Sequence, residues 1–241
     1  RSLEHRPQVG QYLRGEAIKS GGPYQEYWGV DANEPDRMVR LKRSPLDPLA
    51  DQKERAELMT LAQRHAAALN KLQSLHNRAL PILYATFEDE DDDGAMWTAY
   101  EAVDGLTLME ALIPLKEKLL VLSQVAETLE RCHTKNVLHR ALSPNCLVLP
   151  PGERIARILH FDFARVQGKA TVAVGKGKVE LQKNPHVAPE VRRDPTAATP
   201  ASDVWSLGRT AGESLVGRGF SELESADLER AVRKLRPPEV P

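Results

Sequence analysis

The chain has little of several features that would assign a protein quickly to a functional class. Its 241 residues include two cysteines, Cys132 and Cys146, which are too few for a disulfide framework or a zinc site and which fit a reducing compartment. It has no excess of either charge, because 33 basic residues are balanced by 34 acidic ones. That balance gives no support for a nucleic-acid or membrane surface held by bulk charge. It has no run of about 18 apolar residues and no signal-peptide pattern, so we expect a cytoplasmic protein with no membrane segment.

What the chain does contain is material for a packed core. Hydrophobic residues make up 41% of it, and its length suits one two-lobed domain or two small domains. It starts at Arg1 and ends in the sequence PPEVP. We therefore interpret it as a piece of a longer protein.

The most informative stretch covers residues 137–165, VLHRALSPNCLVLPPGERIARILHFDFAR. It predicts a loop, a strand, a turn at residues 150–152 and a second strand that ends at residues 161–163. The stretch resembles the catalytic segment of protein kinases, in which a loop of the form H-R-D-x-K-P-x-N precedes a hairpin and the motif D-F-G.

Only part of that segment agrees with the family. Four residues match it: His139, Arg140, Asp162 and Phe163. Four others replace the family's catalytic aspartate, its lysine, its asparagine and its glycine: Ala141, Ser143, Cys146 and Ala164. Alanine cannot accept a proton or orient an alcohol, and a thiol is a poor ligand for Mg²⁺. The resemblance implies a kinase fold that has lost phosphoryl transfer, which is a pseudokinase.

The N-terminal part resembles the small lobe of a kinase. Two predicted strands, residues 13–18 and 24–30, flank Gly21 and Gly22, which are candidates for the loop that covers the ATP phosphates. The alternative is an ordinary hairpin turn. In the alignment with the glycine-rich loop, Glu26 stands where the family has valine.

The next predicted strand, Met38–Arg43, resembles the V-A-x-K motif. Lys42 takes the place of the lysine that grips the α- and β-phosphates, and Arg40 takes the place of a small residue that roofs the adenine. Alternation puts both side chains on one face, so Arg40 either fills the base pocket or swings out of it. The alternative for Lys42 is a surface lysine on an edge strand.

A helix is expected over residues 51–75, where apolar residues recur at helical spacing. In kinases this helix supplies a glutamate to the strand lysine, but residues 65–68, His-Ala-Ala-Ala, contain no carboxylate. Lys42 would lack its usual partner and could pair with Asp162 instead. Further strands are expected at residues 80–87 and 96–102, a short helix at 108–112 and a longer one at 119–133.

Two later motifs support the same resemblance. Residues 188–190 match A-P-E, and residues 203–208 match D-x-W-S-x-G, which opens the central helix of the large lobe. The resemblance implies that six residues keep the fold rather than act in catalysis: His139, Arg140, Phe163, Glu190, Asp203 and Trp205. In the family, the aspartate at Asp203 bonds to the backbone around His139.

The predicted architecture is α+β and bilobal, with a protein-kinase-like fold. A small β-rich N-lobe spans residues 1–104, and a mainly helical, shortened C-lobe spans residues 105–241. Together they form one domain.

The function implied is that of a regulatory or scaffolding protein-interaction domain that is not an enzyme and needs no cofactor. Its partner would be another protein or another domain of its own chain. Two alternatives stay open: a nucleotide-binding switch, in which Lys42 and Asp162 hold ATP and Asp162 holds magnesium, and a weak or atypical ATP-dependent serine/threonine kinase or transferase. The stretches GGPYQEYWGV and HRALSP also resemble kinase-like domains of bacterial phage-defence proteins (BREX or phage-growth-limitation systems), some of which carry a nuclease-related (NERD) domain.

Overall fold

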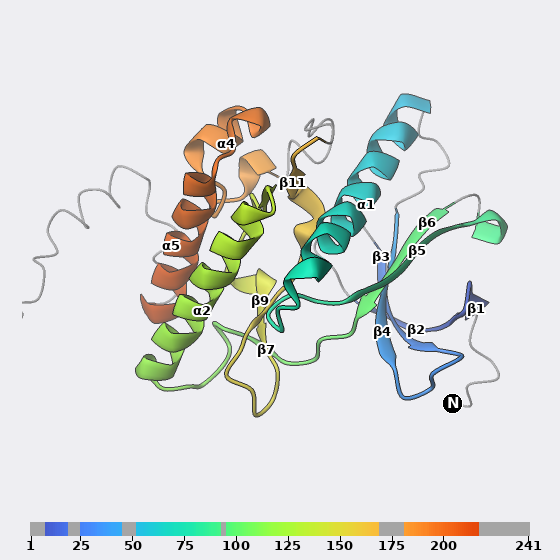
Figure 1. Ribbon diagram of the computed structural model, residues 1–241, viewed down its shortest axis with the longest axis horizontal. Helices are drawn as coiled ribbons and strands as arrows, with labels where there is room; N and C mark the ends of the chain where they lie inside the picture. Colours follow the sequence, from blue (N-terminus) through green and yellow to red (C-terminus); the bar gives the residue numbers. More distant parts are fainter. Residues whose placement is uncertain (1–7, 19–24, 45–51, 93–94, 169–180, 217–241) are drawn as a thin grey trace, which may run out of the picture.

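The computed structural model describes residues 8–18, 25–44, 52–92, 95–168 and 181–216. Figure 1 shows two parts, a β-sheet with one long helix beside it and a second part that is mainly helical. We call the described residues up to Glu101 the small lobe and those from Leu106 onward the large lobe. The bilobal α+β architecture predicted from the sequence is confirmed, while any extent of the large lobe beyond residue 216 lies outside the described residues.

The small lobe is built on one antiparallel sheet. Its elements are β1 (Gln8–Val9), β2 (Tyr12–Ile18), β3 (Gln25–Asp31), β4 (Met38–Arg43), α1 (Gln52–Leu72), a 3₁₀ turn (Gln73–Leu75), β5 (Leu83–Asp89), a 3₁₀ turn (Glu90–Asp92) and β6 (Ala95–Glu101). The six strands lie in the order β1-β2-β3-β4-β6-β5. Between β3 and β4 the register pairs Glu26 with Lys42 and Trp28 with Arg40. Because side chains alternate along a strand, these four residues share one face of the sheet.

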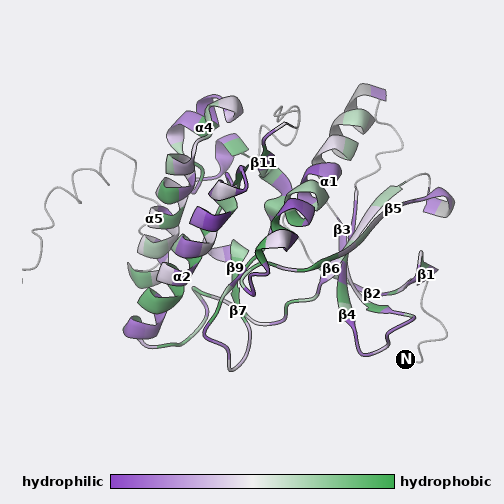
Figure 2. Cartoon of the chain, viewed as in Figure 1, coloured by the Kyte–Doolittle hydropathy of each residue, from purple (hydrophilic) through white to green (hydrophobic). Residues whose placement is uncertain are grey.

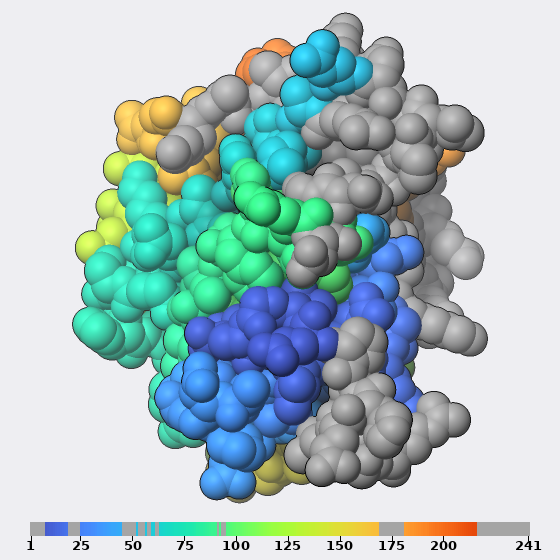
Figure 3. All heavy atoms as spheres, turned by 90° about the vertical axis from the view of Figure 1, so that its right-hand side faces the viewer, coloured from blue at the N-terminus to red at the C-terminus, as the bar shows by residue number. Residues whose placement is uncertain are grey.

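The sheet curls until its two ends meet. The ring of Tyr12 on β2 stacks on that of Phe87 on β5, with centroids 6.1 Å apart. Figure 3 shows the first strands in dark blue directly beside the green chain of β5 and β6. The opposite face of β4, with Val39 and Leu41, is fully buried against Trp97 and its neighbours. The curl therefore leaves the face of Glu26 and Lys42 turned toward the large lobe.

The large lobe combines helices with very short strands. Its elements are β7 (Leu106–Thr107), α2 (Leu115–Thr134), β8 (Val137–Leu138), η4 (Pro144–Cys146), β9 (Leu147–Leu149), β10 (Arg157–Ile158), η5 (Phe161–Phe163), β11 (Arg165–Val166), α4 (Pro189–Arg193), η6 (Pro195–Ala197) and α5 (Pro200–Val216). β10, β9 and β7 form one small sheet, and β11 pairs with β8. Figure 2 shows apolar and polar residues mixed along α2, and its buried side includes Val121, Val125 and Leu129.

Helix α1 joins the two lobes. It contacts β5 and β6 of the small lobe and η5, β8 and β11 of the large lobe. Its last turns contribute Ala68, Leu69 and Leu72 to the main apolar core, which also contains residues of α2 and η5. The residues of η5 are therefore held directly against α1.

Two local expectations were wrong. Residues 108–112 form a turn after β7 rather than a helix, because the hydroxyl of Thr107 donates to the Glu110 carboxylate at 2.7 Å and closes a single turn. Residues 161–163 form the 3₁₀ turn η5 rather than the end of a strand, because His160 adopts a left-handed backbone with φ 63° and stops β10. Among the described residues, no helix has the length and apolar character needed to cross a membrane.

Candidate functional site

The candidate site, which we call the cleft, is the group of side chains where the sheet face of β3 and β4 meets η5. Lys42 of β4 donates a short hydrogen bond to Oδ1 of Asp162, and its Nζ lies 3.4 Å from Oε1 of Glu26. All three residues are buried, with exposed fractions of 3%, 7% and 3% respectively. The sequence anticipated the pairing of Lys42 with Asp162, whereas the contribution of Glu26 emerges only from the structure.

Arg40 stays on this same face and does not swing away from it. Its Nη1 lies 3.1 Å from Oε2 of Glu26, and its guanidinium lies 4.9 Å from the centroid of the Trp28 ring. Its cross-strand partner on β6 is Tyr100. Arg40 therefore lies across the part of the cleft where the family resemblance places the adenine.

Helix α1 brings an imidazole to the cleft. Nδ1 of His65 lies 3.5 Å from Oδ1 of Asp162, and its ring packs edge-on against Tyr100, with centroids 5.1 Å apart. Burial lowers the pKa of His65 to about 3, and burial also lowers the pKa of the neighbouring His160. At neutral pH the helix thus presents an uncharged ring to Asp162.

The two carboxylates of the cleft are ionised. Burial is the largest single influence on Asp162 and opposes its charge, but Lys42, His65 and His160 together outweigh it and hold the pKa of Asp162 well below its ordinary value. The same opposition acts at Glu26, whose pKa is lowered by Lys42 in spite of burial. The cleft is therefore a buried network of alternating positive and negative charges.

The loop between β8 and β9 is held by a different aspartate. The backbone N–H groups of His139 and Arg140 donate to the two oxygens of Asp203, at 2.9 and 2.7 Å. Nε2 of His133, on α2, lies 2.8 Å from the same carboxylate. Asp203 is fully buried in the first turn of α5, so it ties α2, the loop and α5 together.

The side chains of His139 and Arg140 in that loop are also held by hydrogen bonds to backbone carbonyl oxygens. Nε2 of His139 lies 2.9 Å from the carbonyl oxygen of Leu159. Arg140 has a left-handed backbone with φ 67°, and its guanidinium donates to the carbonyl oxygens of Phe163 and Pro195. These bonds set the path of the chain on both sides of the positions where the family carries its catalytic groups.

Those catalytic positions carry no ionised group. Ala141 is buried in a small apolar cluster. Sγ of Cys146 lies 3.3 Å from the hydroxyl oxygen of Ser143 and donates to the carbonyl oxygen of Ala141. Burial raises the pKa of Cys146 to about 11, so it is a neutral thiol at physiological pH. The three residues lie together but supply neither a base nor a charged metal ligand.

The remaining predicted residues lie nearby or outside the described part. Glu190 accepts a hydrogen bond of 2.6 Å from the Ser202 hydroxyl, which joins α4 to α5. Phe163 and Trp205 pack against the apolar cluster that contains Ala141. Gly21 and Gly22 lie outside the described residues.

Sequence reasoning missed the roles of Glu26, His65, His160 and Tyr100. One signal was available for Glu26, because the expected hairpin around residues 21–22 places it within reach of the strand that carries Lys42. No comparable signal marked His65 or His160, since their burial depends on how α1 meets η5.

The architecture and the motifs define a family. The sequence model of the family described as 'Protein kinase domain' matches residues 34–236. The chain therefore belongs to the protein kinase family. It is 25% identical to serine/threonine-protein kinase D of Synechocystis over 209 residues, which cover 84% of this chain and 40% of that protein. It is 27% identical to serine/threonine-protein kinase PknA of Mycobacterium tuberculosis over 219 residues, which cover 87% of this chain and 47% of PknA. The matched region thus spans less than half of these relatives.

These comparisons correct two expectations. The chain was expected not to be an enzyme, but the kinase-domain match and the serine/threonine kinases among its relatives point to an enzyme. It was also expected to need no cofactor, whereas protein kinases use ATP with magnesium. The first expectation rested on the replaced residues of the catalytic loop and on the missing helix glutamate, and the second rested on Arg40 at the base pocket. The family match extends over residues 34–236 and so includes all of these positions.

The chemistry of the cleft fits ATP with one magnesium ion. Lys42 supplies a buried cation for phosphate oxygens, and Asp162 supplies an ionised carboxylate, which is the kind of ligand that Mg²⁺ prefers. Cys146 does not fit as a further magnesium ligand, because its thiol is neutral and soft. The site therefore retains one half of the metal-binding arrangement of the family.

Proposed function

We propose that this chain is a degenerate protein kinase domain that binds ATP with one magnesium ion between Lys42 and Asp162. It transfers phosphate slowly and acts mainly as a regulatory or scaffolding domain. The observation that carries the proposal is the contact of Lys42 with Asp162 in a buried cleft. A lysine and an aspartate are kept together there although Ala141 and Cys146 have replaced their catalytic neighbours.

When bound, ATP supplies the phosphoryl group and magnesium neutralises its charge. The chain's own part is to bind and to orient. Lys42 would hold phosphate oxygens with its cation, and the carboxylate of Asp162 would hold the metal. The loop anchored by Asp203 keeps its shape, but Ala141 cannot accept the proton of an attacking hydroxyl. The lost base lowers the rate by a factor on the order of 10²–10⁴.

The regulatory part of the proposal is supported by exposed leucines just before α2 and in its first turns. Leu112 is fully exposed at 100%, and Leu115 and Leu119 are exposed at 62% and 50%. Leu115 and Leu119 are four residues apart and lie on one face of the helix. Apolar side chains gathered on a surface favour contact with a protein. The partner would be another domain of the parent protein, such as the nuclease-related domain of phage-defence proteins. Replacing both leucines by aspartate should abolish co-purification of that domain without lowering the Tm.

Nucleotide binding is tested by thermal unfolding with ATP or ADP, with and without magnesium. A ligand that binds only the folded protein at a hundredfold excess over Kd adds about 2.7 kcal/mol, which corresponds to a Tm rise of about 5–10 °C. Asp162→Asn should remove the magnesium-dependent part of the rise. Asp36→Asn, the same change at an exposed position, should leave it intact.

Phosphoryl transfer is tested with labelled ATP and serine- or threonine-containing protein. We expect slow incorporation that Asp162→Asn removes. A Tm that does not move with millimolar ATP and magnesium would contradict the proposed site. Turnover at the roughly 1–100 s⁻¹ of ordinary kinases would contradict slow transfer.

A further inference from the structure

Among the residues that the structure describes, Lys42 pairs with two carboxylates on different elements. Asp162 belongs to η5 in the large lobe, whereas Glu26 belongs to β3, the strand next to Lys42 in the sheet. Glu26 and Lys42 are direct cross-strand partners, so the antiparallel ladder itself holds their backbones in register. Each is only 3% exposed.

Both oxygens of the Glu26 carboxylate are engaged by cations. Oε1 lies 3.4 Å from Nζ of Lys42, and Oε2 lies 3.1 Å from Nη1 of Arg40. Arg40 is fixed in turn by its position over the Trp28 ring, 4.9 Å away. A carboxylate held on both sides in a buried setting has one favoured orientation, and that orientation directs Oε1 at Lys42.

The side chains of helix α1 that the structure describes include no carboxylate. The α1 side chain that reaches the carboxylate of Asp162 is His65, at 3.5 Å. It is an imidazole buried to 1% exposure, and so it cannot serve as the anion that a strand lysine needs.

Resting on the proposed function, we propose that Glu26 is the positioning residue for Lys42. It keeps a carboxylate on the lysine when Asp162 turns to magnesium, and so it holds Nζ where the phosphates bind. Arg40 keeps Glu26 in place. The carboxylate that positions the lysine thus lies within the sheet, on β3, the strand that pairs with that of Lys42.

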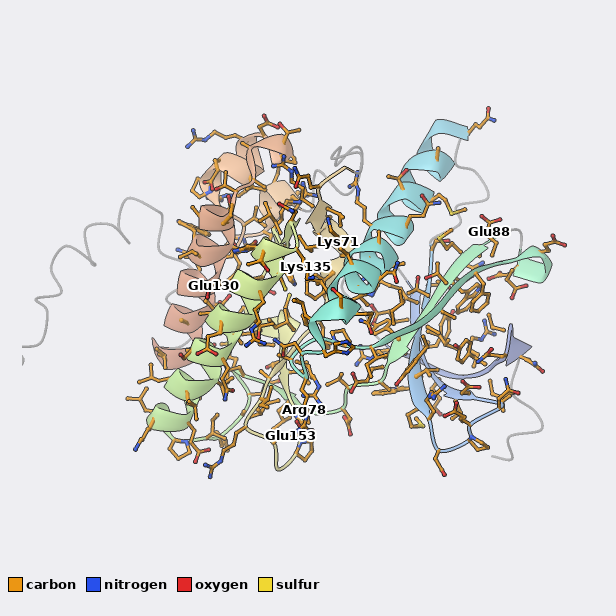
Figure 4. The ribbon with its side chains drawn as sticks, in the orientation of Figure 1. Lys71, Arg78, Glu88, Glu130, Lys135 and Glu153 are labelled. Atoms are coloured by element: carbon orange, nitrogen blue, oxygen red, sulfur yellow. The ribbon has the colours of Figure 1, made fainter. Side chains whose placement is uncertain are left out.

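The test compares nucleotide affinity across a double-mutant cycle. Glu26→Gln should weaken binding of ATP with magnesium about tenfold, the effect of losing one hydrogen bond to a charged group. The same change should have no effect in a Lys42→Met background, because Glu26 acts through the lysine. Glu26→Asp should recover part of the affinity. The matched control is Glu88→Gln on β5, an exposed glutamate of the same lobe (Figure 4), which should bind as wild type does.

The outcomes separate this inference from the proposed function. If the wild-type protein binds no nucleotide, both fail. If it binds and Glu26→Gln binds equally well, or if Glu26→Gln weakens binding as much without Lys42, the positioning role alone is overturned. Tm values measured without ligand show whether Glu26→Gln has merely lost its fold. If it has, Glu26→Asp, which keeps the charge, decides the outcome. Full loss of affinity in a folded Glu26→Asp protein would overturn the inference.

Discussion

Two buried aspartates of this molecule do different work, and the contrast lies in their partners. Asp203 is satisfied by two backbone N–H groups and by His133, all of which belong to fixed elements. Asp162 is satisfied chiefly by the end of a long, flexible lysine side chain. Backbone groups cannot turn away without unfolding the loop, whereas a side chain can exchange one partner for another. The first aspartate therefore maintains shape, and the second can bind a ligand.

The contrast explains how the loop keeps its form without its catalytic groups. Ala141 and Cys146 occupy a path that is set by bonds to the backbone at His139 and Arg140. None of those bonds involves the side chain of residue 141. Removing the catalytic aspartate thus removes chemistry and leaves the frame intact, so a family match over most of the chain coexists with a depleted catalytic loop.

The largest expected effect is the loss of folding stability when Asp203 is replaced. Asp203→Ala leaves the N–H groups of residues 139 and 140 without their acceptor in a buried site, and each unsatisfied group costs about 1–3 kcal/mol. We expect a loss of at least about 3 kcal/mol in the free energy of unfolding, measured with denaturant. Glu130→Ala, on the exposed side of α2 (Figure 4), should change it by less than about 0.5 kcal/mol. Equal stability of Asp203→Ala and wild type would refute the anchoring role.

A smaller effect should appear in the pH dependence of folding stability, because His65 is buried in the cleft. The folded protein keeps His65 unprotonated down to a pKa of about 3, whereas the unfolded chain protonates it near pH 6.5. The unfolded state then binds more protons, so stability is complete above pH 6.5 and falls as the pH drops. Asp162 and Glu26, whose folded pKa values are lowered, add a further loss below about pH 4.5, where the unfolded carboxyls begin to protonate.

The measurement is the change in Tm between pH 7 and pH 5. It should be smaller in His65→Asn than in wild type, because that variant lacks one of the groups that protonate on unfolding. Part of the change should remain, since burial also lowers the pKa values of His139 and His160. The exposed His76 provides the control, and His76→Asn suits its left-handed backbone, φ 45°. An identical change in all three proteins would refute the assignment.

The contacts of the loop held by Asp203 were far easier to predict from the sequence than those of the cleft. His139, Arg140 and Asp203 belong to motifs whose partners are backbone groups at set places in the fold, so matching the motif anticipates the contact. The pairing of Glu26 with both Lys42 and Arg40 depends on the register between two strands, and the turn that sets it has no decisive signal. The turn at residues 108–112 was missed for a similar reason: its apolar residues suit a helix, and a hydroxyl-to-carboxylate bond closes one turn instead.

The smallest effect is expected on nucleotide affinity, from replacing Arg40. Arg40→Ala removes a cation that lies over Trp28 and across the base end of the cleft, and it restores the small residue that the family has there. We expect affinity for ATP to rise about threefold to tenfold, because the flat base gains room to stack. Lys42 still neutralises Glu26, so the Tm should fall only slightly. Adenosine should gain more than ATP, since both ligands gain room for the base but ATP also loses the support that Arg40 gives to Glu26; Glu26→Gln should affect ATP alone. Titration calorimetry can compare the two ligands, with the exposed Arg78→Ala as control (Figure 4). Weaker binding of both ligands would mean that Arg40 is part of the base site and not an obstacle to it.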